Sequence, residues 1–537
     1  MYNSIPYFGK FRQVLVVISC IFAVLNNYIM QLTSKLSIST LVLTAASGLL
    51  AQTASRPNIV LIFPDQFRQN SLGFWSKDNN EKYIQGKADP VNTPNLDKLA
   101  NKSIVFNQAM SNFPLSSPFR GMMLTGTYPD RNGLTTNCHK SKKEHLNSDA
   151  VCISDVLATE GYETAYFGKC HWVQTTPVFD TNGTYVGSEK SPGGEYINPY
   201  DTYVPPGNDR HGFNYFFQTL NDNHYDPMCY SNDSIAIKGL KDGQMYRPHR
   251  FSAEFESEAV LNYLDVTHNQ RDKNKPFLMV WSLNPPHNPW TPASTDMKFF
   301  PQYTENGKVN VDKLLLRQNA DKAVGKYAPY YFANVSAVDH YIGLVLDKLK
   351  EKGLDKNTII IFTSDHGEML GSHGLEGKNV PEIESFNIPF MIKWNGKLKH
   401  KVNDLMLSVP DIMPTVLGLA GYENKIPSQV QGVNYASLLT NDRSNDIKKP
   451  TSALYIGVHA RGVHTGRYTY VVNEQKGKFA NAYMYDNHKD PYQLIRIVDS
   501  KIPPKVLKTL KSELIKQLKS TEDKWFTNKI CYEYLKY

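Results

Sequence analysis

The sequence is poor in cysteine, with 6 in 537 residues, and these stand far apart. No Cys-x-x-Cys pair and no zinc-ligand spacing occurs among them, which excludes a disulfide scaffold and a zinc module. A single disulfide bridge remains open. The chain also lacks internal repeats and low-complexity tracts, so it is not a repeat protein.

Acidic residues are absent from the leader, residues 1–51. Two apolar stretches there, 14–25 and 36–50, are each shorter than the roughly 20 residues that a membrane-spanning helix needs. The second has Met30 as a start and Lys35 as its basic region, which is the layout of an export signal. We therefore expect translation to begin at Met30 and no stable membrane span after signal removal; a tandem membrane anchor is the alternative.

Strong charge of one sign is also missing, since the formal net charge of +8 is mild for this length. Residues 501–536 carry much of the excess positive charge. Leucines recur at helical spacing within this tail, at Leu507, Leu510, Leu514 and Leu518. This pattern predicts an amphipathic C-terminal helix with a solvated basic face, and no nucleic-acid-binding surface.

Short, continuous apolar runs are present, and they are typical of buried parallel strands. Helical patterns lie between them, and the alternation predicts an α/β fold in which helices cover both faces of a mixed, mostly parallel sheet. The expected strands are 57–63, 163–167, 277–283 and 358–362, and the expected helices are 94–100, 153–159 and 332–350.

The pattern changes near residue 425 to short β-like runs, 453–458 and 468–473, followed by the terminal helix. We therefore expect a catalytic domain over residues 52–424 and a small C-terminal domain, 425–537, of antiparallel sheet plus helix. Residues 172–250 interrupt the first domain with a Gly-, Pro-, Asn- and Tyr-rich stretch. Long loops in compact domains are commonly functional, so we interpret it as the rim of a pocket, with His224 as a substrate-binding residue.

A polar residue follows each of the four expected strands: Asp65, Lys169, His287 and Asp365. The carboxyl ends of parallel strands meet at one edge of a sheet, where ligands bind in such folds. These four positions therefore predict an active site.

The segment Ser-Ser-Pro-Phe-Arg-Gly-Met-Met-Leu-Thr-Gly-Thr-Tyr begins at Ser116. It resembles the signature of the formylglycine-dependent sulfatases of the alkaline phosphatase superfamily, in which Pro stands two residues and Arg four residues after the nucleophile. Pro118 and Arg120 have these distances from Ser116, not from Ser117. A serine that only caps a helix is the alternative interpretation.

The resemblance implies an alkaline-phosphatase-like sandwich and a sulfatase of the serine-type bacterial polysaccharide-degrading kind. A serine-type maturating enzyme would oxidise Ser116 to formylglycine (3-oxoalanine) before export. One hydroxyl of the hydrated aldehyde would attack sulfur, and the other would then release sulfate. Arg120 would stabilise the hydrate electrostatically.

The resemblance also implies one bound calcium ion, ligated by Asp65, Gln66, Asp365, His366 and the modified Ser116. Oxygen-rich ligation favours calcium. The commonest set in the family has three Asp and one Asn, so Gln66 and His366 are departures. These departures leave open whether the bound ion is calcium or another divalent metal.

Three further motifs resemble those of the family: Gly168-Lys169-Cys170-His171, Asn284-Pro285-Pro286-His287, and residues 363–374 with the following Lys378. By resemblance, Lys169 and His171 would hold the hydrate, and Lys378 would bind a sulfate oxygen. His171, two residues from Lys169, is expected to be a neutral base. His287 has no adjacent cation in sequence, so we expect it to bind sulfate and to donate a proton to the leaving alcohol. Cys170 is expected to be a packed side chain.

The sequence thus predicts hydrolysis of sulfate esters on carbohydrates, such as algal polysaccharides including ulvan, or host glycans. A formylglycine-dependent phosphonate-ester hydrolase and a non-catalytic sulfated-glycan-binding protein are the alternatives. We expect an exported protein in the periplasm; secretion or a place on the cell surface is the alternative. The sugar, the sulfated ring position, exo or endo action and the oligomeric state stay open.

Overall fold

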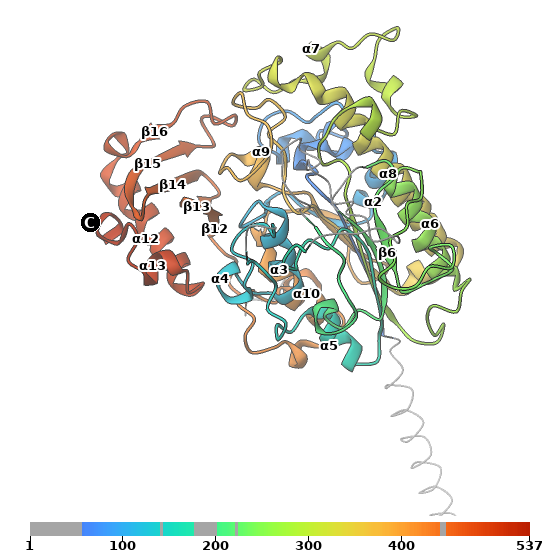
Figure 1. Ribbon diagram of the computed structural model, residues 1–537. Coiled ribbons are helices and arrows are strands. Elements are labelled where there is room, and N and C mark those ends of the chain that lie inside the picture. The colour runs from blue at the N-terminus through green and yellow to red at the C-terminus, as the bar shows by residue number, and fades with distance from the viewer. Residues whose placement is uncertain (1–55, 140–142, 177–200, 221–223, 441–446, 537) are drawn as a thin grey trace, which may run out of the picture. The chain divides into compact units, whose positions relative to one another are not determined.

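A computed structural model describes residues 56–139, 143–176, 201–220, 224–440 and 447–536 (Figure 1). The predicted leader, with Met30 and the export signal, lies outside the described residues. Residues 57–537 form one structural unit; the domain boundary expected near residue 425 stays a prediction. Among the described residues, no helix combines the length and apolar character that crossing a membrane requires.

The main sheet has nine strands within the described residues, in the order β10-β2-β9-β8-β1-β7-β4-β5-β6. The pairs β1–β7, β1–β8, β4–β7, β4–β5 and β2–β10 are parallel, and the other three are antiparallel. The predicted mixed, mostly parallel sheet is therefore confirmed. Its strands are β1 Asn58–Pro64, β2 Ile104–Phe106, β4 Glu163–Gly168, β5 Tyr215–Thr219, β6 Cys229–Ser231, β7 Phe277–Leu283, β8 Thr358–Phe362, β9 Phe390–Trp394 and β10 Lys401–Asn403.

Helices cover both faces of this sheet. Alternate residues of a strand point to opposite faces and therefore pack into different hydrophobic cores. In β1, Leu61 and Phe63 belong to the core that includes α3, α5 and α10, whereas Val60 and Ile62 belong to the core of α2, α6 and α8 (Figure 1). The longer or central helices are α2 Pro94–Ala100, α3 Ser116–Thr125, α5 Ile153–Thr159, α6 Ser252–Asp265, α8 Ala328–Glu351 and α10 Ile412–Leu419. Shorter ones are α4 Pro129–Asn132, α7 Val311–Leu314, α9 Ile383–Phe386 and α11 Ala436–Thr440.

The stretch 172–250 is not only a loop, and this corrects the sequence interpretation. Strands β5 and β6 lie within it and extend the main sheet beside β4. All five residues of β5, Tyr-Phe-Phe-Gln-Thr, are buried. The surrounding Gly, Pro and Asn hid this aromatic run, which pairs with a strand some fifty residues earlier in the sequence.

The C-terminal part folds as predicted into an antiparallel sheet with a helix. The sheet runs β12-β13-β14-β15-β16, and Leu510, Leu514 and Leu518 of α12 are buried against it. Its elements are β12 Ser452–Gly457, β13 Ala460–Thr465, β14 Tyr468–Gln475, β15 Lys478–Asp486, β16 Ile497–Val498, α12 Pro504–Ser520, α13 Lys524–Thr527 and α14 Tyr532–Lys536. A further two-stranded sheet pairs β3 Ala109–Met110 with β11 Leu407–Ser408.

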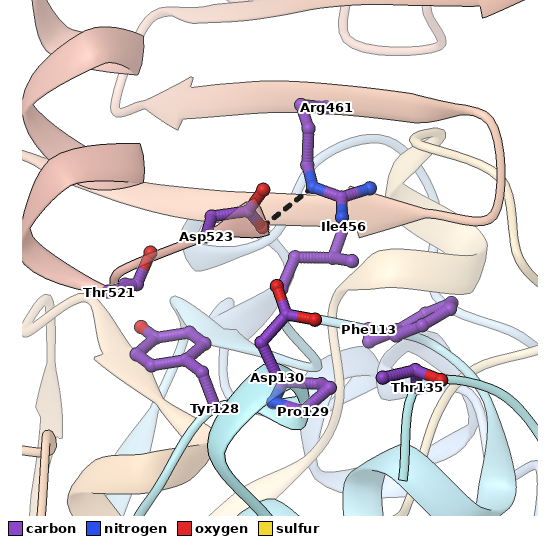
Figure 2. Close-up of a pocket in the computed structure, with 9 residues that line it drawn as sticks. All are labelled: Phe113, Tyr128, Pro129, Asp130, Thr135, Ile456, Arg461, Thr521 and Asp523. Carbon is purple, nitrogen blue, oxygen red and sulfur yellow. Dashed lines mark hydrogen bonds and ion pairs between the residues drawn. The ribbon is translucent and has the colours of Figure 1, made fainter. Parts of the chain in front are cut away.

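A pocket lies between this C-terminal sheet and the α3–α4 region (Figure 2). Its lining includes Asp130 and Asp523, whose carboxylates disfavour an anionic ligand. Arg461, the cation in the lining, is already paired, since its Nε donates to Asp523 Oδ2 at 2.8 Å. No predicted site residue lines this pocket, so it is not the sulfate-binding site.

Candidate active site

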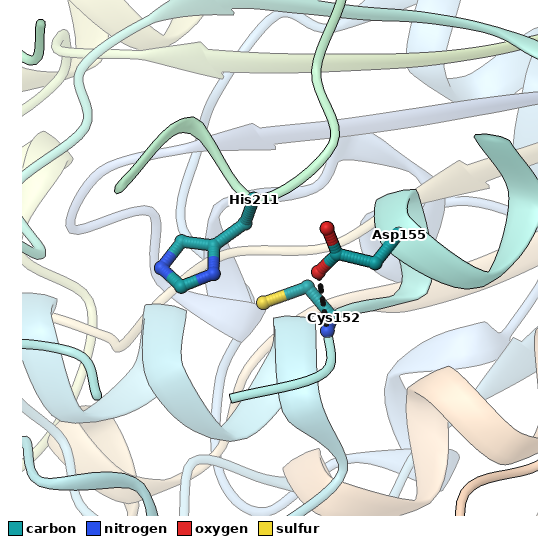
Figure 3. A group of neighbouring side chains, drawn as sticks. All are labelled: Cys152, Asp155 and His211. Carbon is teal, nitrogen blue, oxygen red and sulfur yellow. Dashed lines mark hydrogen bonds between the residues drawn. The ribbon is translucent and has the colours of Figure 1, made fainter. Parts of the chain in front are cut away.

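Two groups of possible metal ligands occur among the described residues. The first is Cys152, Asp155 and His211 (Figure 3). Cys152 precedes α5, and the Asp155 carboxylate accepts a hydrogen bond from the Cys152 backbone N–H at 2.8 Å, as in a capping box. This capping interaction accounts for the position of Asp155 without an ion.

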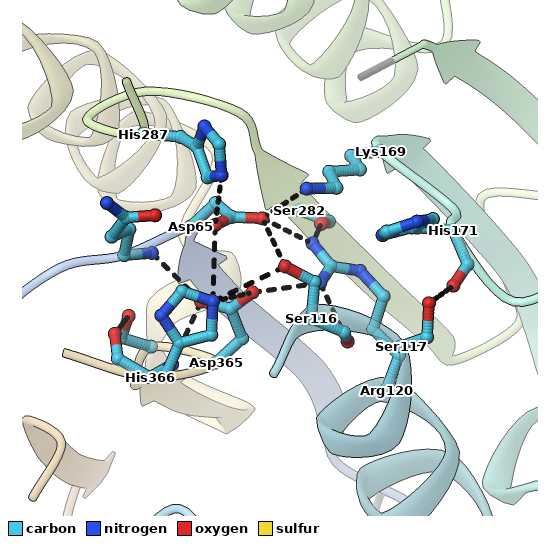
Figure 4. Close-up of polar contacts among 12 residues, drawn as sticks. Asp65, Ser116, Ser117, Arg120, Lys169, His171, Ser282, His287, Asp365 and His366 are labelled. Carbon is cyan, nitrogen blue, oxygen red and sulfur yellow. Dashed lines mark hydrogen bonds and ion pairs between the residues drawn. The ribbon is translucent and has the colours of Figure 1, made fainter. Parts of the chain in front are cut away.

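The second group lies where four neighbouring parallel strands end. Strands β8, β1, β7 and β4 are adjacent in the sheet, and the predicted Asp365, Asp65, His287 and Lys169 follow them in that order. Asp65 N–H donates to the Leu283 carbonyl at 2.9 Å, so the chain leaves β1 while still bonded to the end of β7. The topology therefore brings these four side chains to one edge (Figure 4).

Ser116 opens helix α3 at the same edge and is 1% exposed. Its Oγ lies 3.4 Å from Asp65 Oδ2 and 3.3 Å from His366 Nε2. The residue at the N-cap position is Leu115, and Ser116 is the first residue inside the helix, so the capping alternative is wrong. The neighbouring Ser117 is engaged elsewhere, since its hydroxyl donates to the His171 carbonyl at 2.6 Å. Ser116 therefore faces the polar cluster and Ser117 does not.

Arg120 is fully buried and joins both carboxylates (Figure 4). Its Nη1 donates to Asp365 Oδ2 at 2.9 Å, and its Nη2 lies 3.4 Å from Asp65 Oδ2. Two more bonds of 3.0 Å reach the Ser116 carbonyl and Ser282 Oγ. A guanidinium held at so many points supplies a fixed positive charge beside Ser116.

Asp65 is ionised in this environment. Its burial raises the pKa, but the charges of Lys169 and Arg120 oppose burial, and the pKa lies well below its usual value. Lys169 is the nearest cation, with Nζ 2.6 Å from Asp65 Oδ2. The other oxygen, Oδ1, is buried and has no hydrogen-bond partner among the described residues.

His366 presents a lone pair to the two carboxylates. Its Nδ1 contacts the Gly367 carbonyl at 2.9 Å and therefore carries the proton, which leaves Nε2 bare. Nε2 lies 3.6 Å from Asp65 Oδ1 and 3.4 Å from Asp365 Oδ2. Burial lowers the pKa of His366 to about 4, so the ring stays neutral near pH 7. Lone pairs that face one another repel unless a cation lies between them. The possible ligand atoms, one each from Asp65, Asp365 and His366, lie within 4.8 Å of one another.

Gln66, Lys378 and His287 meet at the open side of the cluster. Lys378 Nζ donates to Gln66 Oε1 at 2.5 Å and lies 2.8 Å from His287 Nε2. The Gln66 backbone is left-handed, with φ of 65°. Its N–H donates to Asp365 Oδ1 at 2.9 Å, and its carbonyl accepts from the Tyr331 hydroxyl at 2.9 Å, which holds the turn.

His287 has no adjacent cation in sequence, but the fold brings one beside it. Lys378, 91 residues further along the chain, lies directly beside it. Burial and then the charge of Lys378 lower the pKa of His287 well below its usual value. Its Nδ1 contacts the Asn288 carbonyl at 2.7 Å and so carries the ring proton, which leaves Nε2 to accept from Lys378.

His171 has the arrangement expected of a base. Its Nε2 lies 3.1 Å from the Cys138 carbonyl and carries the proton, while Nδ1 is buried with no hydrogen-bond partner among the described residues. Burial, and then the charge of Lys169, lowers the pKa of His171 well below its usual value. Cys170, between them, packs in the hydrophobic core as expected.

His224 is fully buried and does not lie on an exposed rim. Its Nδ1 lies 3.0 Å from the Ser294 carbonyl, and its Nε2 has no partner among the described residues. Burial lowers the pKa of His224 to about 4, with smaller effects from the charges of Asp65 and Lys169. The imidazole thus offers one bare acceptor atom.

Sequence reasoning missed two residues of this region. Asn284, which precedes the Pro-Pro-His turn, is 2% exposed, and both polar atoms of its amide lack a partner among the described residues. Glu368, quoted only as part of a motif, accepts hydrogen bonds from Gln66, Leu370 and Gly377. The signal for Asn284 was its place directly after a buried strand, the same signal that indicated Asp65.

The chain belongs to the sulfatase family, whose profile, "Sulfatase", matches residues 57–422. A second profile, that of the N-sulphoglucosamine sulphohydrolase C-terminal region, matches residues 371–537. The protein is therefore a sulfuric ester hydrolase, and the predicted family, fold and enzyme class are confirmed.

Individual relatives are named sulfatases. The chain is 38% identical over 514 residues to the Endo-4-O-sulfatase of Bacteroides thetaiotaomicron, which covers 91% of this chain and 96% of that protein. It is 30% identical over 454 residues to the Ulvan-active sulfatase of Formosa agariphila, and the match covers 82% of this chain and 76% of that protein. A solved B. thetaiotaomicron structure, from work on the metabolism of multiple glycosaminoglycans, is 38% identical with a TM-score of 0.83 and covers 90% of this chain and 100% of that one.

Proposed function

We propose that this enzyme hydrolyses 4-O-sulfate esters within sulfated glycan chains, with glycosaminoglycans as the substrate class. The support comes from the 38% identity to an Endo-4-O-sulfatase along nearly the whole of both chains. The observation that carries the chemistry is the buried meeting of Ser116, Asp65, Asp365 and Arg120. Ulvan is the second candidate, supported by the 30% identity to an ulvan-active enzyme.

The residues present fit a bound divalent cation. The unpartnered Asp65 Oδ1 and the bare His366 Nε2 face one another, and both are fully buried. Asp65, Gln66, Asp365 and His366 would hold the ion together with the modified Ser116 side chain. Their mostly oxygen donors favour calcium. When bound, the cation would supply positive charge that favours binding of a sulfate anion.

Ser116 is proposed to work as formylglycine, whose hydrate supplies the nucleophile and the route by which sulfate leaves. Arg120 fixes the orientation of this side chain through its bond to the Ser116 carbonyl and adds positive charge next to it. Lys169 lies on the Asp65 side and Lys378 on the Gln66 side. With a divalent cation present, these charges exceed those of the carboxylates, which suits a sulfate monoester anion.

Proton transfer is assigned to the two histidines. The bare Nδ1 of His171 can accept a proton from the hydrate, because the other nitrogen is tied to the Cys138 carbonyl. His287 cannot donate from Nε2 in its neutral form, since its proton is on Nδ1. His287 takes up a second proton at Nε2, from Lys378 2.8 Å away or from water, and the bound substrate then places the leaving alcohol oxygen at this N–H in place of Lys378.

His287→Ala and His171→Ala are expected to differ in their dependence on the leaving group. Protonation matters most for a poor leaving group, so His287→Ala should lose far more kcat/KM on a sulfated sugar than on nitrophenyl sulfate, by about 100-fold. His171→Ala should be damaged equally on both substrates. Lys378→Ala should lose kcat/KM on both substrates, because its charge also attracts the sulfate, and should lose more on the sulfated sugar. Selective rescue of His171→Ala by the activated ester would reverse the assignment.

Asn284→Ala tests whether the Asn284 amide, which has no hydrogen-bond partner among the described residues, binds the substrate. Buried, unpaired polar groups destabilise a protein by about 1–3 kcal/mol each, so the variant should have an unchanged or higher Tm without substrate. Its kcat/KM on sulfated oligosaccharide should fall by about 10- to 100-fold, the value of a hydrogen bond to a charged group. A lower Tm with unchanged KM would show that Asn284 is structural.

Maturation and export are part of the proposal. A serine-type maturating enzyme would oxidise Ser116 before export, and the periplasm is the proposed destination. The basic, apolar pattern of residues 1–51 supports export.

The test is a desulfation screen with enzyme co-expressed with a serine-type maturase. Defined oligosaccharides carrying one sulfate at position 2, 4 or 6, in a series of chain lengths, are compared with ulvan fragments. We expect loss of the 4-O-sulfate from internal sugars, with Ser116→Ala as the inactive control. Release only from chain ends, or only from ulvan, would contradict the endo assignment or the glycosaminoglycan assignment respectively.

A further inference from the structure

One buried carboxylate, that of Glu368, collects three N–H donors. Its Oε1 accepts from the backbone N–H groups of Leu370 and Gly377, both at 2.8 Å, and its Oε2 accepts from the Gln66 side-chain Nε2. Glu368 is fully buried, three residues beyond Asp365. It belongs neither to the proposed metal ligands nor to the groups assigned to proton transfer.

The contact to Gln66 decides which way its amide points. A glutamine amide has one oxygen that can bind a cation and one NH₂ that cannot. A carboxylate only accepts hydrogen bonds, so the NH₂ must face Glu368. The oxygen then faces the opposite way, where Lys378 Nζ lies 2.5 Å from it.

The same carboxylate fixes the position of the sulfate-binding lysine. Gly377, whose N–H is held by Glu368, directly precedes Lys378, and its own carbonyl accepts from Met369 N–H at 2.8 Å. The segment that carries Lys378 is therefore anchored to the residue that orients Gln66.

We propose that Glu368 is a positioning residue that turns the oxygen of Gln66 toward the metal and places Lys378 beside it. This accounts for how a neutral glutamine serves at a position where the family commonly has an acidic ligand. The proposal rests on the metal site of the proposed function.

Glutamine cannot replace Glu368 in this role. Three donors converge on the two carboxylate oxygens, whereas a glutamine side chain offers one oxygen and one NH₂. Either orientation therefore sets an N–H against another N–H. Residues that orient metal ligands typically contribute 10- to 100-fold to metal affinity, so Glu368→Gln should weaken calcium binding by about that factor.

Calcium affinity is measured by titration calorimetry on the unmatured protein with intact Ser116, so that the readout does not depend on activity. The matched control is Asp339→Asn. Asp339 is also buried and accepts from two backbone N–H groups, of Asn95 and Leu96, and from the Asn95 side-chain amide, but it lies on α8. Thermal unfolding in chelator gives the stability of each variant without metal. We expect Asp339→Asn to keep wild-type calcium affinity.

The exchange variant Gln66→Glu/Glu368→Gln separates orientation from general structure. In this variant the side chain at position 66 is a carboxylate, so either of its oxygens can face the metal. The side chain at position 368 is an amide, whose NH₂ can donate a hydrogen bond to that carboxylate. We expect its calcium affinity to recover at least tenfold relative to Glu368→Gln.

Gln66→Glu alone is the reference, because a carboxylate at position 66 adds a charged ligand whatever Glu368 does. If the Glu368 carboxylate served only the fold, Gln66→Glu would raise affinity by the same factor in the wild-type and Glu368→Gln backgrounds. Orientation by Glu368 predicts a larger factor in the Glu368→Gln background, measured on protein that thermal unfolding shows to be folded.

Wild-type affinity in Glu368→Gln, or an exchange variant no better than Glu368→Gln, would overturn the proposal. A wild-type protein that binds no divalent cation would overturn the metal site and this inference together. A wild-type protein that binds calcium but releases no sulfate after maturation would contradict the proposed function alone.

Discussion

Ser116→Ala is expected to abolish sulfate ester hydrolysis, with a loss on the order of 10⁶-fold in kcat, as for other enzymes that lose a covalent nucleophile. No described neighbour can substitute, because the Ser117 hydroxyl is bonded to the His171 carbonyl. Ser117→Ala, the matched control, should lose about tenfold or less. The measurement is sulfate release from a sulfated oligosaccharide after co-expression with a serine-type maturase.

The same preparation tests the modification itself. Peptide mass spectrometry of the active wild-type enzyme should show that Ser116 has lost two hydrogens. Activity should scale with the converted fraction when maturase expression is varied. Full activity in a chain whose Ser116 is an unmodified serine would remove formylglycine from the mechanism.

Asp365→Ala is expected to eliminate metal binding and activity together. Asp65 and Asp365 are the two carboxylates in the proposed ligand group, and Arg120 loses its 2.9 Å partner with the second of them. Of its two carboxylate contacts, Arg120 keeps only the longer one, at 3.4 Å to Asp65, so the variant should also unfold at lower temperature. Asp365→Asn keeps the shape and isolates the loss of charge. Elemental analysis and calcium titration measure the bound metal.

Chelation provides the complementary measurement. Exhaustive removal of divalent cations from the matured enzyme should stop turnover, and calcium should restore it. Turnover that persists without detectable metal would sink the metal site. Recovery with zinc but not calcium would show that the nitrogen of His366 has changed the preferred ion.

The sequence predicted the centre of the fold because its strands are unambiguous. Strands β1, β7 and β8 are continuous apolar runs that end in polar residues, a pattern typical of strands buried on both faces of a parallel sheet. Asp65 and Asp365 could be placed at one edge because parallel strands end on the same side. The bounds of α8 differ by a few residues, since its first turn contains Pro329, which a helix tolerates at its start.

Contacts between residues that are distant in the sequence could not be predicted from it. Lys378 meets His287 across 91 residues, and Glu368 meets Gln66 across 302. Periodicity and motif spacing report local order and say nothing about such pairs. The proposed role of His287 as a proton donor therefore depends on a lysine that lies far away in the sequence.

Asn112, four residues before Ser116, is held by a strand made much later in synthesis. Its side-chain amide donates to the Leu454 carbonyl at 2.9 Å across 342 residues, and its carbonyl accepts from Ile456 N–H at 2.7 Å, both in β12. At about 5–20 residues per second, a ribosome needs roughly 20–70 seconds to make that span. In the folded chain Ser116 is 1% exposed. Under the proposed maturation, we expect the maturing enzyme to reach Ser116 more easily before β12 binds Asn112 than after it. Slower translation should then raise the fraction of chains that are converted, which peptide mass spectrometry measures.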